Sequence, residues 1–372
     1  MASHKLSTIT RSSLQHLTPS GDAYITNVKS LSSYSWIDTP KPTIAVPGCP
    51  PLWNPPEPAP ALERDSGLYY IAENAVRLPA SPIEPMFRAL YVTNPSFDLR
   101  SIDVISGRHH IRKLLSFINP GSMRGTIKAF TMKLELVRNT LLLCPHDAPA
   151  TEYIAPHDFR GYGHEFEKVY TTSQIADSTS HHRIISYRFC GLNIMIRHET
   201  DAYVNPRGEA VDSGDGLSDR LDSPPLSPAE KPSPAANNCL TELTVLQEGK
   251  TIPLESTLEI KTRSASKRLP LHDAAAQLWV SQTPKLVRAY HHRARFLKPP
   301  VEDVRAEIQA WEHNNQENLR TLGALINKII MVMKECGGRG RLQYDVATDS
   351  LLIFRDEGAG MLPDDLYSKW DE

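Results

Sequence analysis

The sequence predicts an α/β (α+β) fold, in which helices flank a mixed central β-sheet within a single domain. Segments rich in β-branched and aromatic residues alternate with helical patterns through the middle of the chain. One stretch with almost no large apolar residue interrupts this alternation and indicates a disordered insertion. At 372 residues, length alone would allow two domains, but large single α/β domains reach this size.

The first 65 residues are expected to form a proline-rich extension. Residues 39–60 contain nine prolines, which favour an extended path and disfavour a helix or a central strand. We therefore expect residues 1–65 to wrap the surface of a main domain at residues 66–356. Within that domain, residues 130–143 alternate apolar and polar side chains, which predicts one strand with a buried face.

The central elements follow one another in a definite order. We expect a helix carrying Glu167, strands at residues 183–189, 192–204 and 258–262, a helix at 274–281 and a strand at 285–290. Helix, three strands, helix and strand is the order that a PD-(D/E)XK nuclease core requires. The insertion, at residues 205–238, separates two of these strands and is rich in Asp, Ser, Pro and Gly.

Two helices and a hairpin are expected to complete the domain. Apolar residues recur at helical spacing over residues 301–335, with a break near residues 313–315. Residues 342–346 and 351–355 predict a hairpin, and the tail at 357–372 is expected to be loosely held.

Pairs of charged residues follow the strand period. Glu259 and Lys261 lie two residues apart in a segment of β-formers, and Glu199 and Asp201 share this spacing after an apolar run. We expect two neighbouring strands to present these side chains to one cleft. Carboxylates that hold Mg²⁺ neutralise the charge of a phosphodiester under attack, and a lysine offsets developing negative charge. Each pair alone also fits an ordinary solvated strand face.

The chain resembles the DXO family of RNA decapping nucleases, as a divergent fungal-type member. The first family motif places an arginine before a Leu-x-Lys-Leu-Leu-like segment, which matches Arg108 in residues 107–115. The second motif, a glycine followed four residues later by a glutamate, fits residues 163–167 or 161–165. We prefer Glu167 over Glu165, because Phe166 supplies the apolar position before it.

The remaining motifs are similar as well. Glu199 with Asp201 matches the third, Glu259 with Lys261 the fourth, and Gln277, seven residues before a proline, the fifth. The resemblance spans residues 108–290 and departs from the pattern at Gly107 and His198, where a bulky residue and a glycine are usual.

The resemblance implies a two-metal hydrolase acting on the 5′ end of RNA. It implies removal of faulty or NAD-type caps or triphosphates, followed by 5′–3′ exonucleolysis, with Mg²⁺ or Mn²⁺ as cofactor. Metal ligands would be Glu167, Glu199, Asp201 and Glu259, whereas Arg108 would contact a phosphate. Lys261 and Gln277 would act in catalysis and substrate binding. The rival interpretation is an inactive scaffold that supports another 5′–3′ exoribonuclease, and DNA cleavage is a third.

Charge and composition are compatible with this interpretation. The net charge of −2 argues against a general polyanion binder, yet residues 259–298 hold nine Lys and Arg against two acids. Five scattered cysteines indicate free thiols, and we expect no membrane span. Residues 1–21 faintly resemble a mitochondrial presequence, but we favour a frayed N-terminus and a nuclear or cytoplasmic protein.

Overall fold

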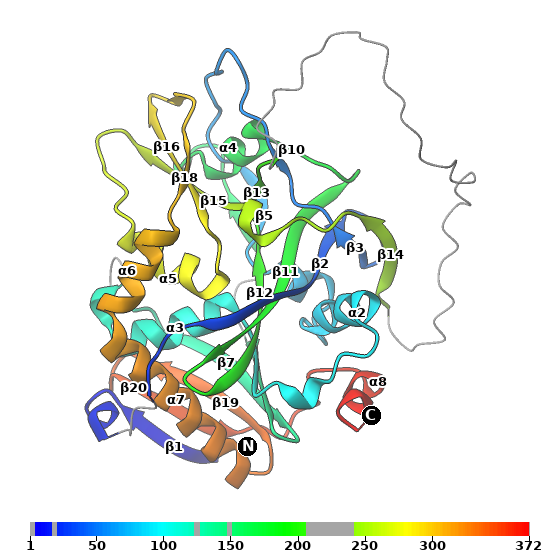
Figure 1. The fold of residues 1–372 in the computed structure, drawn as a ribbon, viewed down its shortest axis with the longest axis vertical. Coiled ribbons are helices and arrows are strands. Elements are labelled where there is room, and N and C mark those ends of the chain that lie inside the picture. The colour runs from blue at the N-terminus through cyan, green and yellow to red at the C-terminus, as the bar shows by residue number, and fades with distance from the viewer. Residues whose placement is uncertain (1–3, 17–20, 123–126, 147–150, 206–241, 372) are drawn as a thin grey trace.

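The computed structural model describes residues 4–16, 21–122, 127–146, 151–205 and 242–371. Large mixed sheets flanked by helices confirm the predicted fold class (Figure 1). The first sheet has eleven strands, in the order β1 (Lys5–Thr10), β20 (Ser350–Arg355), β19 (Arg339–Asp345), β7 (Phe130–Val137), β8 (Thr140–Pro145), β6 (Val104–Gly107), β12 (Leu192–Glu199), β11 (Ser178–Phe189), β2 (Thr26–Ile37), β3 (Thr43–Gly48) and β14 (Thr244–Gly249).

The second sheet lies above the first in Figure 1 and is smaller. Its seven strands are β10 (Thr171–Thr172), β4 (Leu52–Trp53), β13 (Ala202–Tyr203), β15 (Thr257–Ser264), β16 (Lys285–His292), β17 (Arg295–Phe296) and β18 (Val301–Asp303). The strands β5 (Gly67–Tyr70) and β9 (Thr151–Ile154) form a separate pair.

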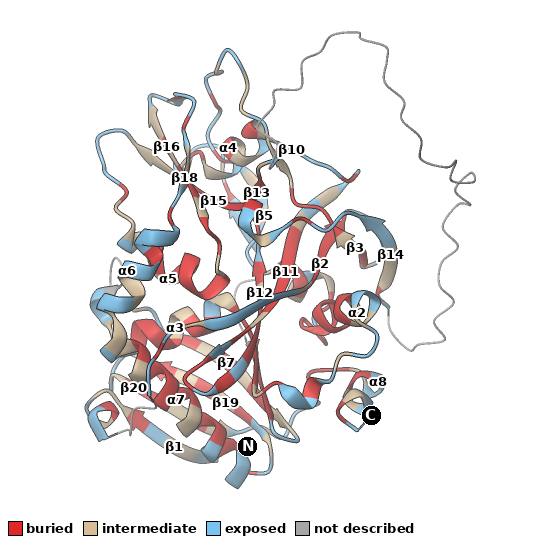
Figure 2. Cartoon of the chain, in the orientation of Figure 1, coloured by how far each residue is buried: buried red, intermediate tan, exposed pale blue. Residues whose placement is uncertain are grey.

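Helices cover both faces of the large sheet, and α4 packs on the smaller sheet. They are α1 (Glu73–Arg77), α2 (Glu84–Thr93), α3 (Arg108–Ile118), α4 (Gly163–Tyr170), α5 (His272–Ser281), α6 (Arg305–Asn314), α7 (Gln316–Glu335) and α8 (Asp364–Tyr367). Helices α3, α5 and α7 share one apolar core with the sheet, whereas α2 and the C-terminal residues share another. Buried residues line the strands between them (Figure 2).

The strand period sorts side chains between these two cores. On β12, Ile194 and Ile196 belong to the core of α3, α5 and α7, while Met195 between them belongs to the core of α2. On β11, Ile184 and Ile185 divide in the same way. Because both faces of the sheet are covered, these strands are apolar on both sides.

The N-terminal region does not wrap the surface as predicted. Strand β2 lies between β11 and β3 in the large sheet, and Ile44, Ala45 and Val46 of β3 are buried. Residues 43–46 are mostly β-formers and begin the strand directly after Pro42, and Pro47 lies inside β3 near its end. The expected frayed N-terminus is also wrong for residues 5–10, which pair with β20 as an edge strand.

Two predicted strands are divided differently in the structure. The segment 130–143 forms the hairpin β7–β8, because Arg138 takes a left-handed conformation (φ 53°) in the turn. The segment 192–204 ends as β12 at Glu199, and β13 then joins the other sheet. Strands β12 and β15 are therefore not neighbours, in contrast to the prediction. The insertion at 205–238 lies outside the described residues except for Asn205.

The C-terminal elements follow the prediction up to the tail. Helices α6 and α7 meet at Asn315, within the predicted break, and β19 and β20 form the predicted hairpin. The tail is packed rather than loosely held. Trp370 is 2% exposed, and its Nε1 donates to Thr140 Oγ1 at 2.8 Å. The local sequence does not show how firmly such a segment is packed, because its apolar side chains are buried by residues that are distant in the sequence.

Candidate active site

The charged pairs singled out in the sequence meet where the two sheets adjoin. Glu167 lies on α4, Glu259 and Lys261 lie on β15, and Glu199 ends β12 with Asp201 just beyond it. Arg108 is the first residue of α3, and Gln277 lies on α5. Five segments that are distant in sequence therefore contribute residues to this region.

Glu259 is the centre of this arrangement. Its side chain is 3% exposed, and its carboxylate accepts hydrogen bonds from Arg108 Nη1 at 3.0 Å and Lys261 Nζ at 2.5 Å. Gln277 Nε2 also donates to it, on the same oxygen as Lys261. Burial alone would raise the pKa of Glu259, but the charges and hydrogen bonds of Lys261 and Arg108 outweigh it and lower the pKa to about 2. Glu259 is therefore ionised at neutral pH.

The other carboxylates hold their protons more tightly. Burial, followed by the charge of Glu259, raises the pKa of Asp201 to about 7. Burial, followed by the charges of Asp201 and Glu199, raises the pKa of Glu167 well above its usual value. Asp201 and Glu167 therefore tend to keep protons that a bound cation would displace.

The backbone of β15 also holds Asp201. Its Oδ2 accepts a hydrogen bond from Ile260 N at 2.7 Å. Ala202 pairs with Leu258 across β13 and β15, so this short bridge brings the end of β12 to the strand of Glu259. Asp201 therefore lies beside Glu259 as expected, but the pairing of β13 with β15 brings it there, and not one continuous strand from residue 192 to residue 204.

Glu167 and Glu165 point to different surroundings. Glu167 interacts electrostatically with Asp201, Glu199, Lys261 and Glu259. Glu165 instead pairs with Lys168 on the outer side of α4, at 3.4 Å. The structure therefore turns the preferred glutamate toward the cluster and the alternative away from it.

Asp65 fixes the first turn of α4, and the sequence alone did not point to it. The side chain is buried, and it accepts hydrogen bonds from Gly163 N at 2.8 Å and Glu165 N at 3.0 Å. Both N–H groups belong to the start of the helix, where no partner within the helix exists. Because Asp65 precedes the helix by about a hundred residues in sequence, no local capping pattern could have revealed it.

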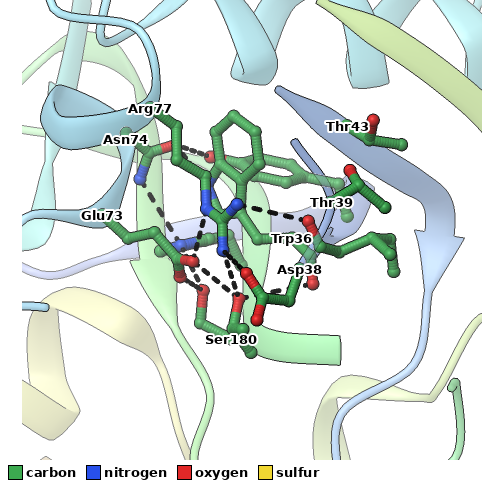
Figure 3. A network of polar contacts seen from close by, with 12 residues as sticks. Trp36, Asp38, Thr39, Thr43, Glu73, Asn74, Arg77 and Ser180 are labelled. Carbon is green, nitrogen blue, oxygen red and sulfur yellow. Dashed lines mark hydrogen bonds and ion pairs between the residues drawn. The ribbon is translucent and has the colours of Figure 1, made fainter. Parts of the chain in front are cut away.

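Figure 3 shows a network of polar contacts that includes Glu73, Arg77 and Ser180. The buried Glu73 binds Arg77 Nε at 2.7 Å, Thr179 Oγ1 at 2.6 Å and Ser180 Oγ at 2.5 Å. The Ser180 hydroxyl also lies 3.2 Å from Nε2 of His182, which pairs with Glu199 across β11 and β12.

The network influences the charge state of Glu199. Solvent reaches this side chain, yet desolvation by the surrounding protein raises its pKa, Arg108 opposes this rise, and Glu73 adds to it. Helix α1 was not predicted from the sequence, so Glu73 was missed. The Glu73 and Arg77 pair, spaced i and i+4, is the only local signal that could have found it.

The predicted basic segment is partly neutralised. Lys285 pairs with Asp303, Arg288 with Glu302, and Lys298 with Glu57. Its positive charge is therefore less available to a polyanion than the residue count suggested.

The donor set suits a hard divalent ion, although the acids are not gathered around one point. Within the described ranges, no three His, Cys, Asp or Glu side chains are arranged to hold one ion. Glu259 is instead saturated by three donors. All four acids nevertheless offer oxygen, the ligand that Mg²⁺ and Mn²⁺ prefer. The pKa of Asp201 and of Glu167 is raised first by burial and then by the neighbouring carboxylates, and a bound cation would offset both effects.

No helix among the described residues is long and apolar enough to cross a membrane. The four described cysteines outside the insertion, at positions 49, 144, 190 and 336, form no disulfide.

Comparisons with known proteins place the fold. A family model described as "Domain of unknown function (DUF8563)" matches residues 9–359, and no curated protein sequence matches the chain. Among solved structures, S. pombe Rai1 has a TM-score of 0.55 and 12% identity, covering 92% of this chain and 98% of that one.

Two further Rai1 structures are similar over comparable lengths. Scheffersomyces stipitis Rai1, in complex with (3′-NADP)+ and calcium ion, has a TM-score of 0.59 and 12% identity, covering 95% of this chain and 98% of that one. Candida albicans Rai1, in complex with pU5-Mn²⁺, has a TM-score of 0.57 and 12% identity, covering 95% and 97%. Rai1 proteins are DXO-family members, so the predicted resemblance is confirmed for the fold.

Proposed function

The chain belongs to the family described as a domain of unknown function (DUF8563), and we propose that it is a metal-dependent hydrolase acting on the 5′ end of RNA. The coarser class, a nuclease of the decapping kind, is supported by the Rai1 fold. The finer proposal includes removal of aberrant or NAD-type caps, with 5′–3′ exonucleolysis as a second step. We place this activity in the nucleus or cytoplasm.

The observation that carries the proposal is that four acids from distant segments share one electrostatic environment with Lys261 and Arg108. Glu167, Glu199, Asp201 and Glu259 come from three separate elements and the turn after β12, yet their charges influence one another. Folding would not gather repelling acids without compensation, and strongly perturbed pKa values of this kind cluster at functional sites.

Each residue has a role that its surroundings support. Glu167, Asp201 and Glu259, with Glu199, would hold one or two divalent ions, Mg²⁺ or Mn²⁺. When bound, such an ion supplies positive charge that stabilises the phosphate under attack. Lys261, whose side chain is 33% exposed, presents an ammonium at the same place and would offset charge on the phosphate oxygens.

Arg108 and Gln277 both bind Glu259 in this structure. Both donate to its carboxylate, which keeps that group oriented and ionised. An entering ion would compete with these donors, so that Arg108 becomes free to contact a phosphate of the RNA, as the resemblance implies.

The ligands of the neighbouring structures support the substrate class. Candida albicans Rai1 is in complex with pU5 and Mn²⁺, and the Scheffersomyces stipitis protein with a nicotinamide dinucleotide and calcium. We extend to this chain the same chemistry, a 5′-phosphorylated or dinucleotide-capped RNA end together with a divalent ion.

The test compares two buried glutamates. Glu259→Gln should lower the release of labelled product from triphosphate- and NAD-capped RNA, with Mg²⁺ or Mn²⁺, by about a hundred- to a thousandfold, the range seen when a key electrostatic group is removed. Glu135 is the matched control, because it is 4% exposed and also has three donors, Arg339 Nε, Met361 N and Tyr367 Oη. Glu135→Gln should leave activity within about twofold while disturbing a comparable buried network. Equal product release by the wild type and Glu259→Gln would refute the catalytic assignment.

The scaffold alternative is favoured by one observation, the saturation of Glu259 by protein donors. In that case the protein would release no product alone but would retain a 5′–3′ exoribonuclease in a pull-down. Glu259→Gln would leave that retention unchanged.

A further inference from the structure

A cavity of about 490 Å³ opens beside Glu167, and neither Glu259 nor its donors Arg108, Lys261 and Gln277 line it. Its walls are the loop before α4, the first turn of α4, and the end of β15 from Thr262 to Ser264. Glu167 is part of the lining, so the cavity is continuous with the acid cluster. Its volume lies within the roughly 300–1,000 Å³ typical of small-molecule sites.

The charge of this cavity is opposite to that of the cluster. Arg160, Arg263 and Lys267 line it, together with His164 and His291. The acids in the lining are Glu167 and Asp65, and the carboxylate of Asp65 is engaged by the backbone of α4. Within the part of the chain that the structure describes, neither Arg160 nor Lys267 forms an ion pair, unlike Lys285, Arg288 and Lys298 farther along the basic segment.

An aromatic ring stands at the entrance. Phe159 is 58% exposed, although a phenyl ring gains nothing from contact with water. Tyr162 meets it edge-on at 5.5 Å and is anchored against Phe296 at 6.2 Å, and the guanidinium of Arg64 lies over one face of the Phe159 ring at 5.3 Å. The ring is therefore supported at its edge and on one face, which leaves the other face for a ligand. A supported, exposed ring beside unpaired cations is the arrangement on which single-stranded nucleic acids bind, with a base stacked on the ring and a phosphate at the cations.

We propose that this cavity is a nucleotide subsite, in which one nucleotide of single-stranded RNA binds next to the reacting phosphate. The base stacks on the face of Phe159 that Arg64 does not cover, and the phosphate is held by Lys267 and Arg160. The inference rests on the proposed function and deepens it, because it states which surface positions the RNA relative to Glu167.

The test measures RNA binding without turnover. A 5′-phosphorylated RNA pentamer with a 3′ fluorophore is titrated with the full chain carrying Glu259→Gln, and fluorescence anisotropy gives Kd at several salt concentrations. Adding Phe159→Ala should raise Kd about tenfold and leave the salt dependence unchanged, whereas Phe159→Trp should retain binding. Adding Lys267→Ala should raise Kd and reduce the slope of log Kd against log salt by about 0.7, the value for one phosphate contact on a single strand.

Two variants outside the cavity serve as matched controls. Tyr24 is 37% exposed beside His313 and Lys334 is exposed on α7, so Tyr24→Ala and Lys334→Ala should bind RNA as the parent does. The inference is overturned if Phe159→Ala binds as tightly as these controls, if Lys267→Ala leaves the slope unchanged, or if the parent does not bind the pentamer. If the wild type hydrolyses RNA while Phe159→Ala binds normally, only the subsite fails. If binding depends on Phe159 but the wild type releases no product, only the proposed activity fails.

Discussion

Replacing Asp65 with alanine should both destabilise the protein and slow hydrolysis. The buried carboxylate accepts from two N–H groups in the first turn of α4, at 2.8 and 3.0 Å. Each such hydrogen bond contributes roughly 0.5–1.5 kcal/mol net, and loss of a helix cap costs roughly 0.5–2 kcal/mol. The expected loss for Asp65→Ala is therefore about 2 kcal/mol of unfolding free energy. Asp65→Asn keeps one acceptor oxygen and should lose about half as much.

Asp65→Ala should also lower the rate of hydrolysis, because it would displace Glu167. This residue lies one turn into an eight-residue helix, and the cap fixes where that turn begins. A displacement of about 1 Å at a reacting group can slow a reaction roughly a hundredfold, so we expect kcat for Asp65→Ala to fall by about 10 to 100-fold.

Urea denaturation and the RNA-release assay measure the two effects separately. Asp98→Ala is the control, because Asp98 caps a short 3-10 helix (Leu99–Ser101) through Arg100 N at 3.0 Å, with its side chain 49% exposed. It should cost about 0.5–1 kcal/mol and leave activity unchanged. The reasoning is refuted if Asp65→Ala unfolds at the wild-type midpoint, or if it loses stability while retaining full activity.

Two further predictions concern the tail and the acid cluster. Trp370→Ala should lower the unfolding free energy by roughly 3–5 kcal/mol, because the side chain is buried against Phe87 and bonded to Thr140; a change below about 1 kcal/mol in urea denaturation would mean that the tail is not packed. The pKa of Asp201 is raised to about 7, so below that pH the folded protein holds a proton that an ion must displace. Titration calorimetry should therefore find Mg²⁺ or Mn²⁺ affinity falling as pH drops from 8 to 6, and the gain in Tm on adding the ion should shrink in parallel. Without the ion, stability should decrease as pH rises from about 4 to about 7, because the folded state binds the extra proton across that window. Affinity that is constant from pH 6 to 8 would exclude Asp201 as a ligand.

Several elements could be predicted because their information is local. The strand period around Glu259 and Lys261 and the helical stripe broken at Asn315 depend on neighbours in sequence, and both agree with the structure. The residues that support the site could not be found in this way. Asp65 and Glu73 act on α4 and β11 across about a hundred residues of chain. Their partners are specified only when the chain has folded.

Prediction failed where composition was used in place of packing. Many prolines suggested a surface wrap, but strand β3 between them has partners on both edges in β2 and β14. The tail, which was expected to be loosely held, shows the same limit. Its apolar residues are buried against β8 and α2, and the sequence of the tail itself does not indicate that these partners are near.

The sequence by itself determined the residue types of the candidate site and the order of the elements that carry them. The reason is that the apolar period of a strand or a helix depends only on residues that are close together in the sequence. Tertiary structure alone decided that β12 ends at Glu199, that Asp201 bonds to β15 rather than extending its own strand, and that Glu167 instead of Glu165 turns inward. The physical reason is that a shared electrostatic environment depends on distances between segments, which only the pairing of the two sheets and the packing of α4 establish.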